Sequence, residues 1–226
     1  QERKGFLTFI GEAGTGKTTL LRKLLEELGP DVLPVFLFNP DVGFEEILQY
    51  TLGELGIACP TQRRLDMLQR LNEFLLAAYT EGRNTVLLID EAQDLNEIQY
   101  RIICGLRDKL GVLVNMVGDP NQNIYQFRES SDKYLREFKG TVFVLTVNFR
   151  SHSSIVEFSK HLRPFTDYDV KCHKGDNQTV PFFTFYDDEA KLEKDIVELL
   201  KMVKQIGANY KDVAIISPTR GKMRGE

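Results

Sequence analysis

GFLTFIGEAGTGKTTLL, Gly5 to Leu21, passes from a short apolar run through a glycine-rich turn into a helical pattern. The turn, Gly11–Thr18, satisfies G-x-x-x-x-G-K-[ST] without a mismatch, which is the spacing of loops that enclose phosphate groups. Glycines let the backbone N–H groups of such a loop point inward at phosphate oxygens, and the following helix offers its positive N-terminus. Strand, loop and helix in this order predict the first unit of an α/β fold that binds a nucleotide.

This loop contains most of the candidate nucleotide ligands. We expect Lys17 to reach the β- and γ-phosphates and the Thr18 hydroxyl to bind magnesium. The other expected nucleotide-binding residues of this stretch are Gly11, Glu12, Ala13, Gly14, Thr15, Gly16 and Thr19. The alternative is a plain glycine turn that happens to carry Lys-Thr.

A pair of carboxylates follows a second apolar run. Val86–Ile89 is continuously aliphatic, as in a strand buried on both faces, and it ends at Asp90-Glu91. Together with the upstream loop, this predicts that Asp90 holds magnesium and that Glu91 polarises the attacking water. An isolated Asp-Glu pair at a strand end could instead be a solvated terminus. ATP and Mg²⁺ are the expected cofactors, and hydrolysis of ATP to ADP and phosphate is the expected reaction.

The rest of the chain largely alternates between strand and helix patterns, which predicts a mainly parallel sheet with helices on both faces. Strands are expected at Phe6–Ile10, Val32–Phe38, Val86–Ile89, Val112–Val117, Thr141–Val147, Phe182–Tyr186 and Val213–Ser217. Helices are expected at Thr18–Leu28, Phe44–Leu55, Arg64–Tyr79, Asn96–Lys109, Asp132–Phe138, Ser153–Leu162 and Glu189–Ile206. The segment Arg163–Pro181 shows no clear period and is expected to be irregular.

The composition is that of an ordinary globular chain, with 226 residues, 42% hydrophobic and 27% charged. No apolar run approaches the roughly 20 residues of a membrane helix, so no membrane partner is expected. Three widely spaced cysteines have neither metal nor disulfide spacing, which favours a cytoplasmic protein. The net charge of −4 neither supports nor excludes nucleic acid. A chain that starts at Gln1 is expected to be a trimmed fragment.

The first two fifths of the chain resemble ExeA/GspA-type ATPases of the AAA group. The resemblance rests on GFLTFIGEAGTGKTTLLRKLLEEL, VFLFNP, ILQYTLGELGI and RLNEFLLAAYTEGRNTVLLIDEAQDL. Only the phosphate loop and the carboxylate pair in these segments are chemically specific.

From Asp90 onward the chain resembles UvrD/Rep-type superfamily 1 DNA helicases. DEAQD is similar to motif II of that family, VGDPNQNIYQFR (Val117–Arg128) to motif III, and LTVNFRSHSSIVEFS (Leu145–Ser159) to motif IV. DVAIISPTR (Asp212–Arg220) is similar to a strand of the second motor domain. The resemblance implies a RecA-like P-loop domain over residues 1–140 and a partial second RecA-like domain over 141–226, without motifs V and VI.

The helicase resemblance also implies roles for five residues. Gln122 would sense the γ-phosphate, Arg150 would act as an arginine finger, and Phe149 would lie against adenine. Phe127 would stack on a DNA base, and Arg128 beside it would couple motif III to the nucleotide site. The alternatives are core aromatics for the two phenylalanines, surface charges for the two arginines and turn chemistry for the glutamine.

Other features depart from the helicase pattern. Lys17 and Asp90 are only 73 positions apart, too few for the insertion that such helicases carry, and no motif Ia is recognisable. Natural recombination, an assembly artefact, deliberate design of a chimera or a divergent small helicase would each account for this. We expect a monomeric ATP-dependent helicase or translocase, or a fragment of one, acting on single-stranded or partly duplex DNA. The alternatives are an ExeA-like regulatory ATPase acting on a protein partner and a nucleotide binder with little turnover.

Overall fold

The computed structural model describes residues 6–37, 43–124, 127, 129–163, 168–175, 181, 186 and 188–216. Contacts within the chain divide it into two compact units, residues 1–181 and 182–226. The expected domains, 1–140 and 141–226, stay a prediction.

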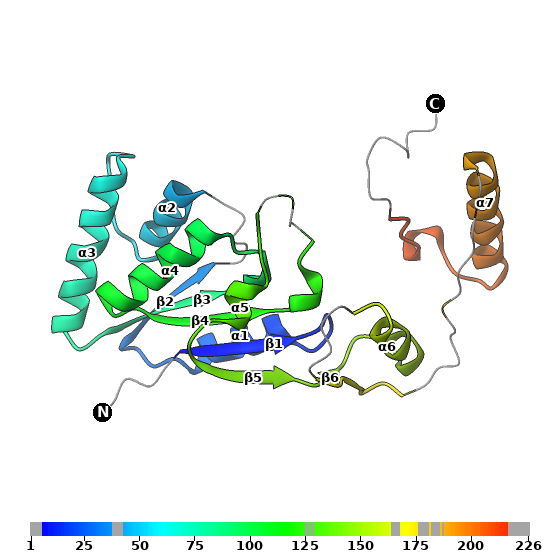
Figure 1. Cartoon of the computed structure of the whole chain (residues 1–226), viewed down its shortest axis with the longest axis horizontal. Helices are drawn as coiled ribbons and strands as arrows, with labels where there is room; N and C mark the ends of the chain where they lie inside the picture. The colour runs from blue at the N-terminus through cyan, green and yellow to red at the C-terminus, as the bar shows by residue number, and fades with distance from the viewer. Residues whose placement is uncertain are drawn as a thin grey trace. The chain divides into compact units, whose positions relative to one another are not determined.

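The first unit is built on a five-stranded parallel sheet (Figure 1). Its strands are β1 (Leu7–Gly11), β2 (Val32–Leu37), β3 (Asn84–Ile89), β4 (Leu113–Gly118) and β5 (Thr141–Leu145). They lie in the order β2-β3-β4-β1-β5, and every neighbouring pair is parallel. Because all strands run the same way, the loops after β1, β3 and β4 gather at one edge of the sheet, where open α/β sheets bind their ligands. The parallel α/β fold is confirmed.

Helices and short 3₁₀ turns connect these strands. The helices of this unit are α1 (Lys17–Glu27), α2 (Phe44–Glu54), α3 (Arg64–Thr80), α4 (Glu97–Leu110), α5 (Lys133–Arg136) and α6 (Ser153–Lys160). Two 3₁₀ turns, η1 (Ala92–Asp94) and η2 (Pro120–Gln122), follow β3 and β4. Asn96 caps α4 in a capping box, since its Oδ1 accepts the Gln99 N–H at 3.0 Å and the Gln99 Oε1 accepts the Asn96 N–H at 2.8 Å.

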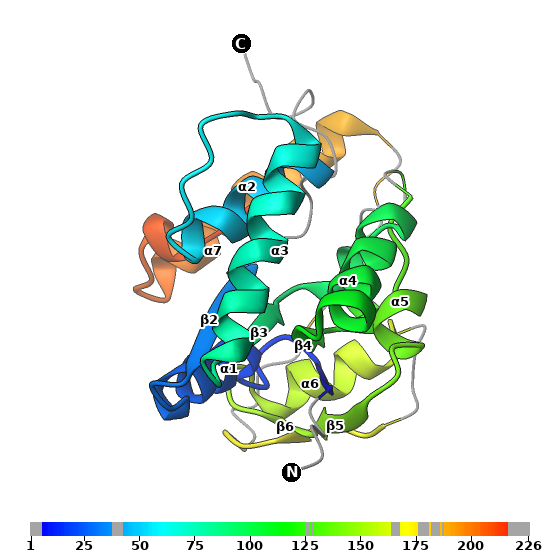
Figure 2. The same cartoon turned by 90° about the vertical axis from the view of Figure 1, so that its left-hand side faces the viewer.

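Side chains of the sheet alternate between two apolar layers. One layer joins the sheet to α2–α5 and includes Val35, Leu37, Leu87, Ile89, Val114 and Met116. The other contains Leu21 of α1 with Phe36, Val86, Leu88 and Val117. Figures 1 and 2 show α2, α3 and α4 along one side of the strands. Helices therefore cover both faces, as predicted. Leu21 is fully buried, and burial of such a side chain contributes about 1.5–3 kcal/mol.

A second, two-stranded parallel sheet follows β5. It pairs β6 (Val147–Asn148) with β7 (Lys171–Cys172). The expected single strand Thr141–Val147 is thus broken at Thr146, whose carbonyl accepts the Lys171 N–H at 2.8 Å. The expectation that Arg163–Pro181 is irregular is wrong at Lys171–Cys172, because pairing with β6 orders a strand too short to show a sequence period.

In the second unit the structure describes α7 (Glu189–Gln205) and the 3₁₀ turn η4 (Tyr210–Asp212). The helix agrees with the expected Glu189–Ile206 to within one residue, and the Asp188 side chain caps it by accepting the Lys191 N–H at 2.7 Å. The strand expected at Val213–Ser217 is wrong for Val213–Ile216, which form no ladder; a strand needs a neighbour to pair with. Ser217 and most of the strand expected at Phe182–Tyr186 lie outside the described residues.

Candidate nucleotide-binding and hydrolysis site

The phosphate loop closes between the end of β1 and the start of α1. Gly14 and Gly16 have φ values of +87° and +85°, the left-handed region that glycine adopts without steric cost. The backbone N–H and the Oγ1 of Thr15 both donate to the Glu12 carbonyl, at 3.2 and 2.8 Å. These bonds tighten the loop ahead of the helix N-terminus, the arrangement that sequence analysis predicted for phosphate binding.

The Lys17 ammonium lies inside this loop. Its Nζ donates to the carbonyls of Gly11 at 2.9 Å and of Glu12 at 3.2 Å, and the residue is 9% exposed. The loop therefore holds the cation by its own backbone. Phosphate oxygens would replace part of this coordination, so the charge is placed before a nucleotide arrives.

Thr18, in the first turn of α1, contacts Asp90, which follows β3. The Thr18 Oγ1 donates to the Asp90 Oδ2 at 3.2 Å, and Asp90 is 5% exposed. Burial raises the pKa of the Asp90 carboxyl above its ordinary value, and the Glu91 charge raises it further. A hydroxyl beside a buried carboxylate is an oxygen pair that Mg²⁺ prefers, and a cation there would offset both effects. The two residues fit the expected metal.

Glu91 has an unusual backbone. Its φ of +54° lies in the left-handed region, which costs a non-glycine residue of order 1–3 kcal/mol and is often found at active sites. The Gln93 Nε2 donates to the Glu91 Oε2 at 2.7 Å, and the Gln93 Oε1 accepts the Asp119 N–H at 2.9 Å. Gln93, which is 1% exposed, therefore ties the carboxylate after β3 to the end of β4.

Sequence reasoning missed the positioning part played by Gln93, although the residue stands within DEAQD. A supporting signal was the glycine at the end of β4. A Cβ on Gly118 would lie 2.6 Å from the Gln93 Oε1, so only glycine leaves room for this side chain.

Gln122 lies in η2, after β4. Its Nε2 donates to the Asp119 Oδ2 at 2.5 Å, while the Asp119 Oδ1 accepts the Asn121 N–H at 3.0 Å. Gln122 lines a pocket of about 210 Å³ together with Glu12, Ala13 and other residues of the loop edge and of α6. The side chain is thus placed beside the phosphate loop, and its action on the γ-phosphate stays a prediction.

The segment after β6 contacts the phosphate loop directly. The Phe149 N–H donates to the Gly14 carbonyl at 2.8 Å, and the Asn148 Nδ2 donates to the Ala13 carbonyl at 2.8 Å. A Cβ on Gly14 would come within 2.6 Å of the Arg150 Cβ. The structure therefore brings the helicase-like and AAA-like segments together at one site. Sequence reasoning placed Arg150 and Phe149 in that site but did not include Asn148.

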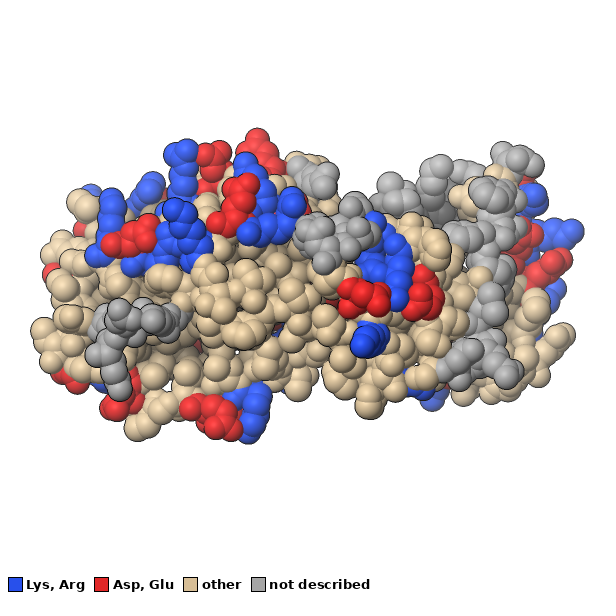
Figure 3. Space-filling model, turned by 60° about the horizontal axis from the view of Figure 1, so that its bottom comes forward, with Lys and Arg blue, Asp and Glu red and all other residues tan. Residues whose placement is uncertain are grey.

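The exposed fractions of the two aromatic candidates decide between their alternatives. Phe149 is 52% exposed, with its ring centroid 5.0 Å from that of His173, and Phe127 is 76% exposed. Neither is a core aromatic, which removes that alternative. Arg128 lies outside the described residues. Figure 3 shows acidic and basic side chains side by side on the face in view, with no continuous basic stripe among the described residues there.

A largely buried ion pair lines the same pocket as Gln122. Arg163, just after α6, contacts the Glu12 carboxylate, and both side chains are 9% exposed. Burial raises the pKa of Glu12, and the Arg163 charge opposes that shift. The Glu12 side chain is thus paired with Arg163, and contact between Glu12 and a nucleotide stays a prediction.

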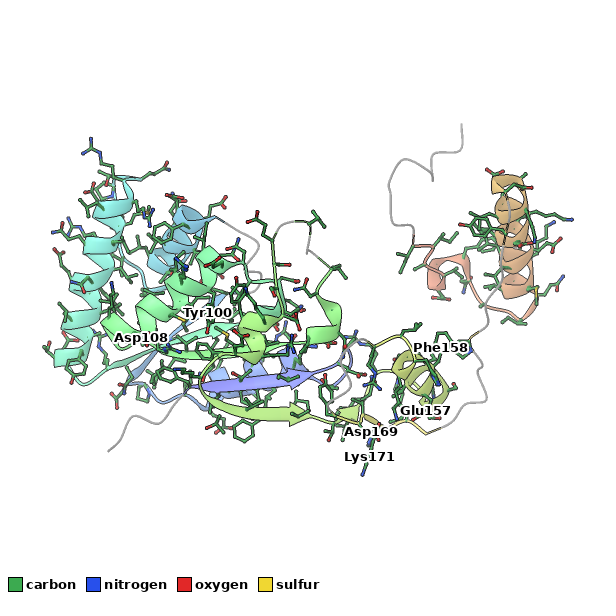
Figure 4. The ribbon with its side chains drawn as sticks, viewed as in Figure 1. Tyr100, Asp108, Glu157, Phe158, Asp169 and Lys171 are labelled. Carbon is green, nitrogen blue, oxygen red and sulfur yellow. The ribbon has the colours of Figure 1, made fainter. Side chains whose placement is uncertain are left out.

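Nearby, Lys160 of α6 bridges Glu157 and Asp169, at 2.7 Å each. Glu157 and Asp169 are labelled close together in Figure 4. This bridge links α6 to the segment before β7.

Among the described helices, none has the length and hydropathy that crossing a membrane would require.

A family model described as an AAA domain matches residues 1–123, more than half of the chain. The chain belongs to this AAA-domain family. The match agrees with the phosphate loop, the Thr18–Asp90 pair and the parallel sheet, and it makes the chain a P-loop ATPase. It ends before β6, so the turn that contacts the loop lies outside it.

Relatives of this AAA-domain chain confirm both sequence resemblances. The "Putative ATP-dependent DNA helicase R568" of Acanthamoeba polyphaga mimivirus is 40% identical over 160 residues, which cover 67% of this chain and 23% of the relative. The "General secretion pathway protein A" of Aeromonas hydrophila is 31% identical over 120 residues, which cover 53% of this chain and 21% of the relative. The chain therefore spans under a quarter of the length of these relatives.

A solved structure, Cdc6p from Pyrobaculum aerophilum, is similar to the AAA-domain chain with a TM-score of 0.46 and 22% identity. The similarity covers 63% of this chain and 40% of the Pyrobaculum chain.

Proposed function

We propose that this chain is the ATP-hydrolysing part of a DNA helicase or translocase, with one active site made by the phosphate loop, β3 and the turn after β6. The observation that supports it is the contact between Phe149 and Gly14, because it sets the Arg150 turn against the loop that would hold the phosphates. An arginine in this position can stabilise charge on the transferred phosphoryl group.

Each residue then has a defined task. The loop N–H groups and Lys17 bind the phosphates, and Thr18 with Asp90 would hold Mg²⁺. Held there, the metal would neutralise negative charge on the phosphates. Glu91 accepts a proton as water attacks the γ-phosphorus, the bond to the ADP oxygen breaks, and the products are ADP and phosphate. Gln122 and Arg150 contact the γ-phosphate.

DNA would contact the surface near Phe127. An exposed aromatic stacks on a base with a free energy of roughly 1–3 kcal/mol, which corresponds to a roughly 5- to 150-fold change in affinity. The mimivirus relative, which is named as a DNA helicase, also supports DNA as the partner. We expect a monomeric, cytoplasmic protein.

The test is stimulation of ATP hydrolysis by single-stranded DNA. At low salt, DNA should raise the rate, and added salt should weaken the effect because phosphate contacts are screened. Phe127→Ala should shift the half-maximal DNA concentration upward roughly 5- to 150-fold. Tyr79→Ala, an exposed aromatic at the end of α3, is the control and should leave this midpoint in place. No stimulation at low salt would refute a DNA motor.

The similarity to the Aeromonas protein favours a second candidate, a regulatory AAA ATPase that acts on a protein partner. Such enzymes complete their site with an arginine from a neighbouring subunit, so this candidate predicts oligomers that form with nucleotide. Light scattering with and without ATP distinguishes the two, because a monomer in both conditions excludes the regulatory ATPase.

Single-turnover hydrolysis tests whether Arg150 acts in this chain. Arg150→Ala should slow the reaction about 10³-fold or more if the arginine reaches the γ-phosphate. Equal slow rates in both proteins would instead indicate the third alternative, a nucleotide binder with little turnover.

A further inference from the structure

The Asn148 side chain uses both ends of its amide. Its Nδ2 donates to the Ala13 carbonyl at 2.8 Å, across 135 positions of sequence, and its Oδ1 accepts the N–H groups of Arg150 and Ser151, both at 2.9 Å. The residue is 4% exposed, so water does not substitute readily for these partners. The amide side chain offers a donor and an acceptor on one carbon, and Asn148 uses both.

We propose that Asn148 is a positioning residue for ATP hydrolysis, which joins the phosphate loop to the turn that carries Arg150 so that the two are placed as one unit. This inference rests on the proposed role of Arg150 at the γ-phosphate. Asn148 itself touches no reacting atom; it acts through the loop and through Arg150.

The direction of the loop peptides supports this role. The C=O and N–H groups of a trans peptide point in opposite directions, so holding the Ala13 carbonyl against Asn148 turns the Gly14 N–H away from the turn. Where a peptide of such a loop binds phosphate, its N–H points at the phosphate and its carbonyl points away. Asn148 and Phe149 donate to the outward carbonyls at the tip of the loop, the Asn148 Nδ2 to that of Ala13 and the Phe149 N–H to that of Gly14.

The turn is also fixed from its other side. The Asn148 carbonyl accepts the His173 N–H at 2.9 Å, which extends the pairing of β6 with β7. Gly14 lets the loop approach the Asn148 side chain, because a Cβ there would lie 2.8 Å from the Asn148 Oδ1. Asn148 thus stands between a fixed strand pair and the loop tip, and removing its side chain frees Arg150 to take other positions.

The experiment is a double-mutant cycle in single-turnover hydrolysis without DNA. Asn148→Ala should lower the rate constant about 100-fold, as expected for a displacement of order 1 Å at the reacting centre. The KM for ATP should change less, because Lys17, Thr18 and Asp90 keep their contacts. In the Arg150→Ala background, the same substitution should cost less than about 3-fold, since coupled residues are non-additive.

Two further variants separate positioning from folding. Asn148→Asp keeps the acceptor for the Arg150 N–H but loses the donor to Ala13, so it should be nearly as slow as Asn148→Ala. Asn115→Ala is the matched control: Asn115 is also buried and its Oδ1 accepts the Leu7 N–H at 3.1 Å, within the sheet. It should lose stability but keep its rate per folded molecule.

Three results would overturn this inference alone: an Asn148→Ala rate within about 2-fold of wild type, independent effects of the Asn148 and Arg150 substitutions, or an equal loss of rate in Asn115→Ala. An Arg150→Ala rate equal to wild type would overturn it together with the arginine finger. These rates are measured without DNA, so they do not depend on whether DNA stimulates hydrolysis. The positioning role of Asn148 and the proposal of a DNA motor can therefore fail independently.

Discussion

Gly14→Ala places a methyl group against the turn after β6. Its φ of +87° costs an alanine about 1–2 kcal/mol. The new Cβ would also lie 2.6 Å from the Arg150 Cβ, whereas carbon atoms are in favourable contact at about 3.5–4.0 Å. The turn must therefore retreat by about 1 Å, and a displacement of that size at a reacting centre can cost about 100-fold in rate.

We expect Gly14→Ala to lower the free energy of unfolding by about 1–2 kcal/mol and kcat by about 100-fold. Urea unfolding of the nucleotide-free protein measures the free energy of unfolding, and steady-state ATP hydrolysis with Mg²⁺ measures kcat. Gly82→Ala is the control, because Gly82 has a φ of +77° and open space around its Cβ. It should lose similar stability and keep kcat; equal kcat in the two variants would refute the reasoning.

Substitutions at Asp90, Arg163, Glu12 and Glu91 test the charged groups of the site. Because burial raises the pKa of Asp90, its ionised form destabilises the fold above the ordinary aspartate pKa. Asp90→Asn should therefore unfold at higher urea than wild type at neutral pH, with the difference fading in acid. Arg163→Met leaves the Glu12 charge buried without its partner and should lower the free energy of unfolding, measured by chemical denaturation, by about 3–5 kcal/mol. Adding Glu12→Gln to this variant should restore most of that loss. A loss under about 1 kcal/mol would show that the ion pair is not needed for stability. Glu91→Gln should bind a fluorescent ATP analogue like wild type yet hydrolyse ATP about 10²–10⁴-fold more slowly, and normal turnover would exclude Glu91 as the base.

Local pattern was sufficient to predict some parts of the molecule. The spacing of Gly11–Thr18 and the aliphatic run before Asp90 each follow from a few neighbouring residues, so the loop, β3 and the Thr18–Asp90 pair were predictable. The place of β1 between β4 and β5 was not, because strand pairing joins residues far apart in sequence.

The parts that sequence reasoning missed have non-local causes. Asn148 and Gln93 both stand in quoted motifs, but their partners are the Ala13 carbonyl and the Asp119 N–H, which only the folded chain brings near. The strand β7 has two residues, too few for any period. At Val213–Ile216 an apolar run suggested a strand, yet the described residues of that unit provide no strand to pair with it.

The long sequence separation between Ala13 and Asn148 bears on the order in which the site is completed during synthesis. Chains emerge from the ribosome at about 5–20 residues per second, so the loop is exposed several seconds before its anchor is made. Bringing Ala13 and Asn148 together costs chain entropy, which is offset only when the later strands have paired. The nascent chain therefore carries the whole phosphate-loop sequence while the Asn148 contact is still missing, and the tip of that loop gains its last support only after β6 has emerged.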